Sequence, residues 1–257
     1  MPDPTSSAFD HTSVAPSTSV STQINEDTGR AIVSNRLLVV VWRILIIVAS
    51  LTGIIMGSKS ISDFVAKLLY FTIQSNLILI LCIGYAVWAT LRNVAGPSPF
   101  LKGAATVYIS ITGLVYNLIL AKALAASPLP VGTIIVPFIG GTLSNDLVHI
   151  IAPLMAVIDW LLFDVHGRLR WQYPLRWLVY PLAYLAFVLI RGLIVHGPFV
   201  YPNLHYPYPF LNVDKIGYSG IALNTLIYGI AFWLIGLVFV VVDRPVLAHF
   251  SHKANKE

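Results

Sequence analysis

The sequence predicts an all-α integral membrane protein whose six transmembrane helices form one bundle, with both termini on the cytoplasmic side. Hydrophobic residues make up 57% of the 257 residues and charged residues only 11%, against about 25% charged in an ordinary globular domain. The mean hydropathy is +0.79. These observations exclude a soluble enzyme. Despite the net charge of +5, no compact basic patch favours nucleic acid as a partner.

The chain divides into a tail, a transmembrane domain and a second tail. Residues 1–35 are rich in Ser, Thr and Pro and carry too little apolar surface to offset chain entropy, so we expect a disordered cytoplasmic tail. Six apolar segments make up the domain at 36–244, each near the roughly 20 residues that cross a bilayer as a helix. They span 37–57, 64–90, 103–126, 143–163, 175–196 and 218–242. Residues 245–257 form a short basic cytoplasmic tail.

The charges of the loops predict the orientation. Most lysines and arginines fall in the N-terminal tail, the second loop (Lys102 among them), the fourth loop and the C-terminus. Because loops rich in Lys and Arg stay on the cytoplasmic side, both termini are predicted to be cytoplasmic. The second, fourth and sixth helices then begin at the outer face. The absence of a eukaryotic sorting signal is compatible with a bacterial plasma membrane, which we expect as the location.

Polar side chains at membrane depth are costly and therefore mark candidate functional positions. In the predicted topology, one group of them falls in the outer half of the membrane on several different helices. The group consists of Thr72, Asn76, Asn117, Asn145, Asp146, His149, Arg191 and Asn224. Independent scatter would spread such residues over both halves, so the clustering predicts a shared polar cavity open to the outer leaflet or outer face. Thr72 is expected about two turns into its helix, on the same face as Asn76.

Each of these residues also has a structural interpretation. A threonine in a membrane helix often bonds the carbonyl four residues back, and asparagine side chains often join helices. Arg191 could neutralise Asp146 across the bundle. Near the cytoplasmic end, Arg43 is expected to pair with Asp159 or Asp243. The functional prediction therefore depends on the clustering and not on any single residue.

Two outer connections are longer than the others. Residues 127–142 contain no charge and several prolines and glycines, which favours a segment at the outer interface. Residues 197–217 alternate prolines with tyrosines and a phenylalanine. Because proline stiffens the chain and aromatic rings favour the interface, this loop is expected to be a lid over the polar cavity or an interfacial anchor. On the cytoplasmic side, a tight turn is predicted around a left-handed Gly167, with a turn role for His166.

Nucleophilic catalysis needs a hydroxyl or thiol activated by a base. Thr72 and His149 are the natural couple, since they are predicted at similar depth on two helices. Asp146 could orient the imidazole, and Asn76 or Asn117 could donate to an oxyanion. The other polar residues of the group are assigned to substrate or oxyanion binding. The sequence contains no local hydrolase or metalloprotease motif, and we predict neither a metal site nor a cofactor.

These residues carry a resemblance to a known family. The six-helix pattern, Phe71-Thr72 on the second helix and the Asn145 to His149 spacing on the fourth are similar to the androgen-induced-protein/FAR-type family of membrane lipid hydrolases and its bacterial six-helix relatives. The resemblance implies that Thr72 is the nucleophile and His149 the general base in the cleavage of fatty acid esters of hydroxy fatty acids. The chain departs from the characterised members in its YFTIQSN segment, in Arg191 and in the proline-aromatic outer loop.

Several functions stay open at this point. A lipid-ester hydrolase would act on a fatty-acyl substrate from the membrane lipids, and it requires the Thr72 hydroxyl and His149 within about 4 Å. A transporter or lipid-binding protein would use the same polar group to hold a headgroup, with Arg191 binding an anion. His149 and His196 could ligate a haem iron, although six-helix haem proteins usually supply more histidines. A purely structural protein is disfavoured by the buried polar cluster.

Overall fold

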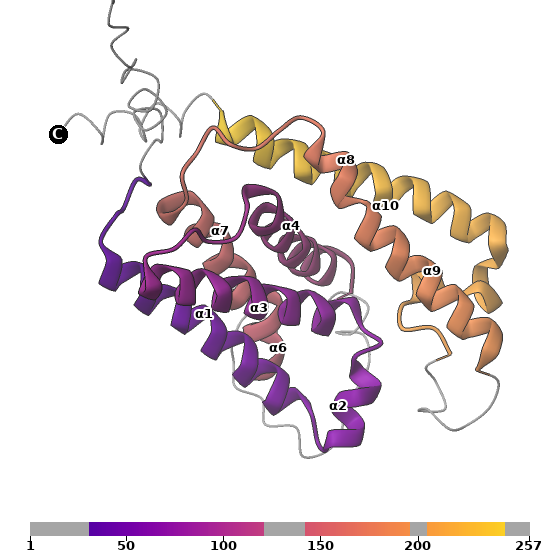
Figure 1. The fold of residues 1–257 in the computed structure, drawn as a ribbon. Coiled ribbons are helices and arrows are strands. Elements are labelled where there is room, and N and C mark those ends of the chain that lie inside the picture. The colour runs from indigo at the N-terminus through magenta and orange to yellow at the C-terminus, as the bar shows by residue number, and fades with distance from the viewer. Residues whose placement is uncertain (1–30, 121–141, 196–204, 245–257) are drawn as a thin grey trace, which may run out of the picture.

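The computed structural model describes residues 31–120, 142–195 and 205–244 (Figure 1). This part of the chain contains helices and no strands. Six of its helical segments are long and apolar enough to cross a membrane, which confirms the predicted class of multi-pass helical membrane protein. They are Arg36–Gly57 (α1), Phe71–Arg92 (α3), Pro99–Leu120, Leu143–Phe163, Tyr173–Ile194 and Val213–Asp243 (α10). Most of the predicted N-terminal tail, the 127–142 segment except its last residue, and the C-terminal tail lie outside the described residues.

Three of these segments are composite. The third consists of α4 (Pro99–Val115) and the π-helix η1 (Tyr116–Leu120). The fourth consists of α6 (Leu143–Asp146), the π-helix η2 (Leu147–Ile151) and α7 (Ala152–Phe163), and the fifth of α8 (Tyr173–Trp177) and α9 (Val179–Ile194). In Figure 1, α1, α3, α4 and α7 gather on one side, and α8, α9 and α10 run together along the other. The α9 and α10 helices are the least buried of the six spans, so they would present most of their surface to lipid.

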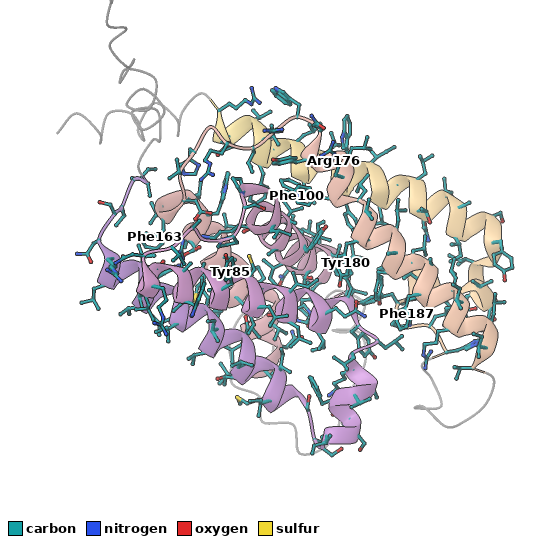
Figure 2. The ribbon with its side chains drawn as sticks, viewed as in Figure 1. Tyr85, Phe100, Phe163, Arg176, Tyr180 and Phe187 are labelled. Atoms are coloured by element: carbon teal, nitrogen blue, oxygen red, sulfur yellow. The ribbon has the colours of Figure 1, made fainter. Side chains whose placement is uncertain are left out.

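Aromatic rings fill the space between α4 and the α8–α9 segment. The ring centroids of Tyr108 and Tyr180 lie 4.8 Å apart, and those of Phe100 and Tyr173 lie 5.1 Å apart. Figure 2 labels Phe100 on α4 and Tyr180 on α9. Trp177 is 2% exposed, and its indole N–H donates to the carbonyl of Phe100 (3.1 Å). The burial of these large rings packs α4 against the α8–α9 segment and so joins the two sides of the bundle.

The predicted second helix, 64–90, is wrong at its start. A separate helix α2 (Ile61–Lys67) precedes α3. The Ser60 hydroxyl accepts the Asp63 N–H (3.1 Å), and the Asp63 carboxylate accepts the N–H of the residue before Ser60 (2.8 Å), a variant of the capping box shifted by one residue. The box starts α2, which ends at Lys67, and α3 begins at Phe71, so Thr72 lies in the first turn of α3 rather than two turns in.

Buried charges join the helix ends that lie opposite Thr72. We call Arg43, Lys102, Asp159 and Asp164 the ion cluster. Arg43 pairs with Asp159 (Nε to Oδ1, 3.1 Å) and with Asp164 (3.2 Å). Lys102 pairs with Asp159 (2.5 Å) and also contacts Asp164. The predicted pairing of Arg43 with Asp159 is confirmed. The prediction that Lys102 belongs to a loop is wrong, because its side chain is buried in α4 against these carboxylates.

Asp243, the other predicted partner of Arg43, holds the end of α10 instead. Its Oδ1 lies 3.0 Å from His166 Nδ1, and the second ring nitrogen of His166 lies 2.9 Å from the carbonyl of Leu161. Gly167 has a left-handed backbone (φ 80°), as predicted, and donates its N–H to the Asp243 carbonyl (3.1 Å). The turn therefore positions a buried histidine that ties α7 to α10.

Candidate functional site

Thr72 and His149 come together at the start of α3. Thr72 Oγ1 lies 3.1 Å from His149 Nε2. The other ring nitrogen, Nδ1, lies 3.0 Å from the backbone carbonyl of Asn145 and donates its N–H to it. Because Nδ1 then carries the proton, Nε2 presents its lone pair to the Thr72 hydroxyl, which is the tautomer that a general base needs. The separation is within the 4 Å that a hydrolase requires, while the catalytic roles themselves stay predictions.

His149 lies in the middle of a π-helical segment, and Pro153 explains how the backbone of this segment is bonded. Proline has no N–H, so Pro153 cannot bond the carbonyl four residues before it, that of His149, or the one five residues before it, that of Val148. The side-chain amide of Asn76 donates to the Val148 carbonyl (3.3 Å), and that of Asn117 donates to the His149 carbonyl (3.1 Å). Side chains of neighbouring helices thus satisfy the freed groups, as the membrane interior demands.

The side-chain N–H groups of Asn76 and Asn117 are already hydrogen-bonded and are not directed at an oxyanion. Besides its bond to η2, Asn76 donates to the carbonyl of Thr72 (2.9 Å), and Asn117 donates to the carbonyl of Gly113 (2.8 Å). An amide NH₂ group has two hydrogens, so both donors of each side chain are engaged by carbonyls. In this geometry Asn76 and Asn117 hold η2 against α3 and η1, and the oxyanion role predicted for them stays untested.

Two glycines allow the neighbouring helices to approach η2 closely. A Cβ on Gly113 would come within 2.9 Å of the His149 carbonyl oxygen. A Cβ on Gly53 would come within 2.7 Å of the Val148 side chain. Any side chain at either position would displace the segment that carries the histidine.

Tyr116 and Asn145 complete the surroundings of His149. The Tyr116 ring stacks on the imidazole, with centroids 3.9 Å apart and planes at 22°. The side-chain amide of Asn145 donates to the Tyr116 hydroxyl. Asp146 is fully buried, but the imidazole Nδ1 is oriented by the Asn145 carbonyl. Tyr116 was not among the predicted site residues, and its position next to Asn117 was the available signal.

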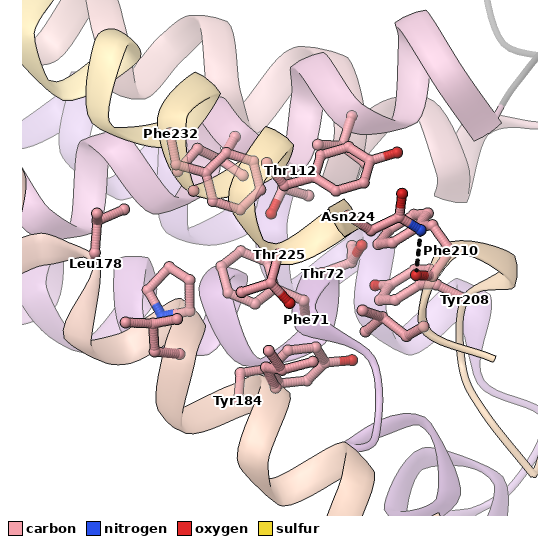
Figure 3. A pocket seen from close by; sticks show the side chains of 18 of the residues that line it. Phe71, Thr72, Thr112, Leu178, Tyr184, Tyr208, Phe210, Asn224, Thr225 and Phe232 are labelled. Carbon is pink, nitrogen blue, oxygen red and sulfur yellow. Dashed lines mark hydrogen bonds between the residues drawn. The ribbon is translucent and has the colours of Figure 1, made fainter. Parts of the chain in front are cut away.

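An apolar cavity of about 100 Å³ lies beside Thr72 (Figure 3). Residues of α3, α4, η1, α9 and α10 line it, together with the segment that precedes α10. None of the lining residues that the structure describes carries a charge, and most are aliphatic or aromatic. Thr72 belongs to the lining, whereas His149 does not. The threonine hydroxyl therefore lies between a base on one side and an apolar chamber on the other.

Arg191 and Asn224 hold the segment that covers this cavity. Arg191 donates to the carbonyl of His205 (3.0 Å), and Asn224 donates to the carbonyl of Phe210 (2.9 Å; dashed line in Figure 3). Asn224 lines the cavity and Arg191 does not. Among the described residues, no ion pair joins Arg191 to Asp146. Of the predicted group, these two residues are the ones that lie away from His149.

The histidine environment also bears on the haem alternative. Both ring nitrogens of His149 are engaged in hydrogen bonds, which disfavours it as a haem ligand, and His196 lies outside the described residues. Within the described ranges, no group of three or more His, Cys, Asp or Glu is placed to hold a metal ion. A comparison of the chain with protein-family models, curated proteins and solved structures gives no match in any of the three. Function is therefore inferred from the geometry of the site.

Proposed function

We propose that this chain is an intramembrane lipid-ester hydrolase in which Thr72 is the nucleophile and His149 the general base. The observation that carries the proposal is the 3.1 Å contact between Thr72 Oγ1 and His149 Nε2 at the wall of an apolar cavity. The bond from His149 Nδ1 to the Asn145 carbonyl supports it, because that bond leaves Nε2 as the acceptor. The same two residues carry the resemblance to membrane lipid hydrolases.

The first half of the reaction forms an ester on Thr72. Nε2 of His149 takes the hydroxyl proton while Oγ1 bonds to the carbonyl carbon of the substrate, and the carbonyl π electrons move onto oxygen to give a tetrahedral oxyanion. Collapse re-forms the carbonyl and breaks the bond to the alcohol oxygen, which takes the proton from His149. The alcohol leaves, and the acyl group stays on Oγ1.

The second half uses water. A water molecule gives a proton to Nε2, and its oxygen attacks the acyl carbon. Collapse breaks the bond to Oγ1, which takes the proton back, and the fatty acid is released. The Tyr116 ring stacked on the imidazole favours one orientation of His149 through both halves.

The substrate class follows from the cavity. Its uncharged, mostly apolar lining suits a fatty-acyl chain drawn from membrane lipids, which are the expected partners. In a plasma membrane, bacterial by our expectation, with both termini cytoplasmic, Thr72 would lie in the outer half, where acyl chains of the outer leaflet can reach it.

A lipid-binding or transport protein is the second candidate. The observation that favours it is the same charge-free cavity, which suits an acyl chain whether or not the chain is cleaved. In that case Thr72→Ala would weaken binding of a lipid, and the wild type would turn over no ester.

Covalent labelling of the full-length protein in detergent with a fluorophosphonate probe tests the proposal. We expect labelling of the wild type at the peptide that contains Thr72, and at least about a hundredfold slower labelling of Thr72→Ala and His149→Ala. Thr106→Ala is the matched control. Its hydroxyl is also buried in a membrane helix, but it bonds the carbonyl of Lys102 (3.0 Å) away from the cavity. A folded wild type that neither labels nor cleaves a fluorogenic acyl ester would rule the hydrolase out.

A further inference from the structure

The structure points to a role for Tyr208, which lies in the segment between α9 and α10. Its ring is nine-tenths buried, packs edge-on against Tyr70 (5.9 Å) and stacks on Phe210 (5.1 Å, planes at 3°). It lines the same cavity as Thr72. In Figure 3 its hydroxyl points toward Thr72 at the start of α3. The phenol therefore reaches the position where the carbonyl of a bound ester would meet the nucleophile.

The Tyr208 hydroxyl lies beside the first turn of α3, whose N–H groups have no side-chain cap. The carbonyl of Tyr70 accepts the N–H groups of Ile73 and Gln74, and no side chain caps this helix. Burial raises the pKa of Tyr208 to about 12, while hydrogen bonding with the Thr72 side chain and with the backbone of Thr72 and Phe71 acts in the opposite direction. The phenol thus keeps its proton at neutral pH, next to donors that favour negative charge.

The segment that carries Tyr208 is anchored on both flanking helices. Asn224 of α10 bonds the Phe210 carbonyl, and His205 Nε2 lies 2.6 Å from the Gly192 carbonyl of α9. A Cβ on Gly192 would come within 2.5 Å of the Tyr206 ring, so this contact admits only glycine without a shift. An anchored donor costs little reorganisation during a reaction, which is the condition for effective oxyanion stabilisation.

We propose that Tyr208 is a catalytic residue that donates a hydrogen bond to the oxyanion formed on Thr72, together with the N–H groups of Phe71 and Thr72. This inference rests on the proposed hydrolase and gives the oxyanion a donor other than the amides of Asn76 and Asn117, which are bonded to carbonyls. No proton is transferred. The negative oxygen of the tetrahedral intermediate accepts the bonds and returns its electron pair to the carbonyl when the intermediate collapses.

The test compares Tyr208→Phe with the matched control Tyr206→Phe in the full-length protein. Tyr206 lies in the same segment and is equally buried, but it packs on Gly192 and does not line the cavity. With a fluorogenic acyl ester, we expect kcat to fall by about 10²–10³-fold in Tyr208→Phe, the usual cost of losing one oxyanion donor. KM should stay nearly constant, and Tyr206→Phe should keep the wild-type kcat.

Two further readouts separate catalysis from folding. Tyr208→Phe should lose affinity for a trifluoromethyl ketone, which forms a tetrahedral adduct, without losing affinity for a non-hydrolysable ether of the same chain. Phe71→Pro removes one N–H at a first helical position that tolerates proline. It should lower kcat relative to Phe71→Leu, which removes the ring alone, and this comparison stands even where Tyr208→Phe does not fold.

The outcomes distinguish the two proposals. If the wild type turns over ester, Thr72→Ala does not, and Tyr208→Phe keeps or exceeds the wild-type kcat, the oxyanion role of Tyr208 is wrong and the hydrolase stands. A gain in kcat would mean that the phenol blocks the N–H groups of α3 in the resting state. If the wild type turns over no ester, both proposals fail.

Discussion

Two buried polar groups of this bundle, the ion cluster and the Thr72 and His149 pair, lie at opposite ends and are built differently. The ion cluster contains cations and carboxylates that face one another directly, with Arg43 and Lys102 each bonded to Asp159. The Thr72 and His149 pair carries no formal charge, and it is held through backbone carbonyls of α6 and of the π segment η2. In the ion cluster each charge is paired with an opposite charge, whereas Thr72 lines a cavity. Compensated charges join helices, while an oriented neutral pair beside an empty space can react.

The largest effect on stability is expected at the ion cluster. Asp159 is fully buried, so Asp159→Asn would leave Arg43 and Lys102 short of a carboxylate and should lower the free energy of unfolding by about 3–5 kcal/mol. Thermal unfolding in detergent measures this. Asp214→Asn, at a side chain 60% exposed, is the control and should change little. At a temperature where Asp159→Asn is folded, fluorophosphonate labelling should persist, and its loss would show that the two ends are not independent.

The opposite pattern is expected at the Thr72 end. Asn117→Ala removes the donor to the His149 carbonyl and should cost only about 0.6–1.7 kcal/mol, the range of hydrogen bonds between membrane helices. Because His149 lies on the released segment, the labelling rate should fall by about a hundredfold, as a misplacement of about 1 Å can do.

Pro153→Ala provides the internal control for this effect. It restores the N–H that can bond to the His149 carbonyl. In that background Asn117→Ala should cost less stability, so the double-mutant cycle should give a positive coupling energy. An equal cost in both backgrounds would mean that the amide does not compensate for the proline.

The smallest effect is expected at the exposed contact between His205 and Asp214 (2.8 Å). The hydrogen bond to the Asp214 carboxylate raises the pKa of His205 above its ordinary 6.5. A histidine whose pKa rises on folding contributes stability that is full below pH 6.5 and is lost as the pH increases through the raised value. The wild type should therefore exceed Asp214→Asn in unfolding midpoint at about pH 5.5, by a margin that shrinks toward about pH 8.5. A margin independent of pH would contradict this linkage.

Much of the architecture could be predicted from the sequence because hydropathy and charge act over whole segments. The six spans and the partner of Arg43 follow from rules on length and on the cost of an unpaired charge. The approach of Thr72 to His149 follows from placing both at one depth. These predictions need only the order of the helices and the direction in which each one runs.

The remaining features depend on contacts that no single segment reveals. The separate helix α2 begins at the side-chain cap of Ser60, a local bond that the hydropathy of the run does not reveal. The use of Asn117 follows from a carbonyl that Pro153 leaves free on another helix. Tyr208 reaches Thr72 only because its segment folds back onto α9 and α10, which depends on bonds such as that from Asn224.

The π segment also fixes an angle. The composite helix α6–η2–α7 carries His149 near one end and Asp159 near the other, and each must face its own partner, Thr72 or Arg43. A π turn contains one residue more than an α turn, and one residue of an α-helix corresponds to a rotation of about 100°. Removing one residue from η2 while His149 stays in place would therefore swing Asp159 by about 100° away from Arg43. The extra residue sets the rotational phase between the two ends of one helix.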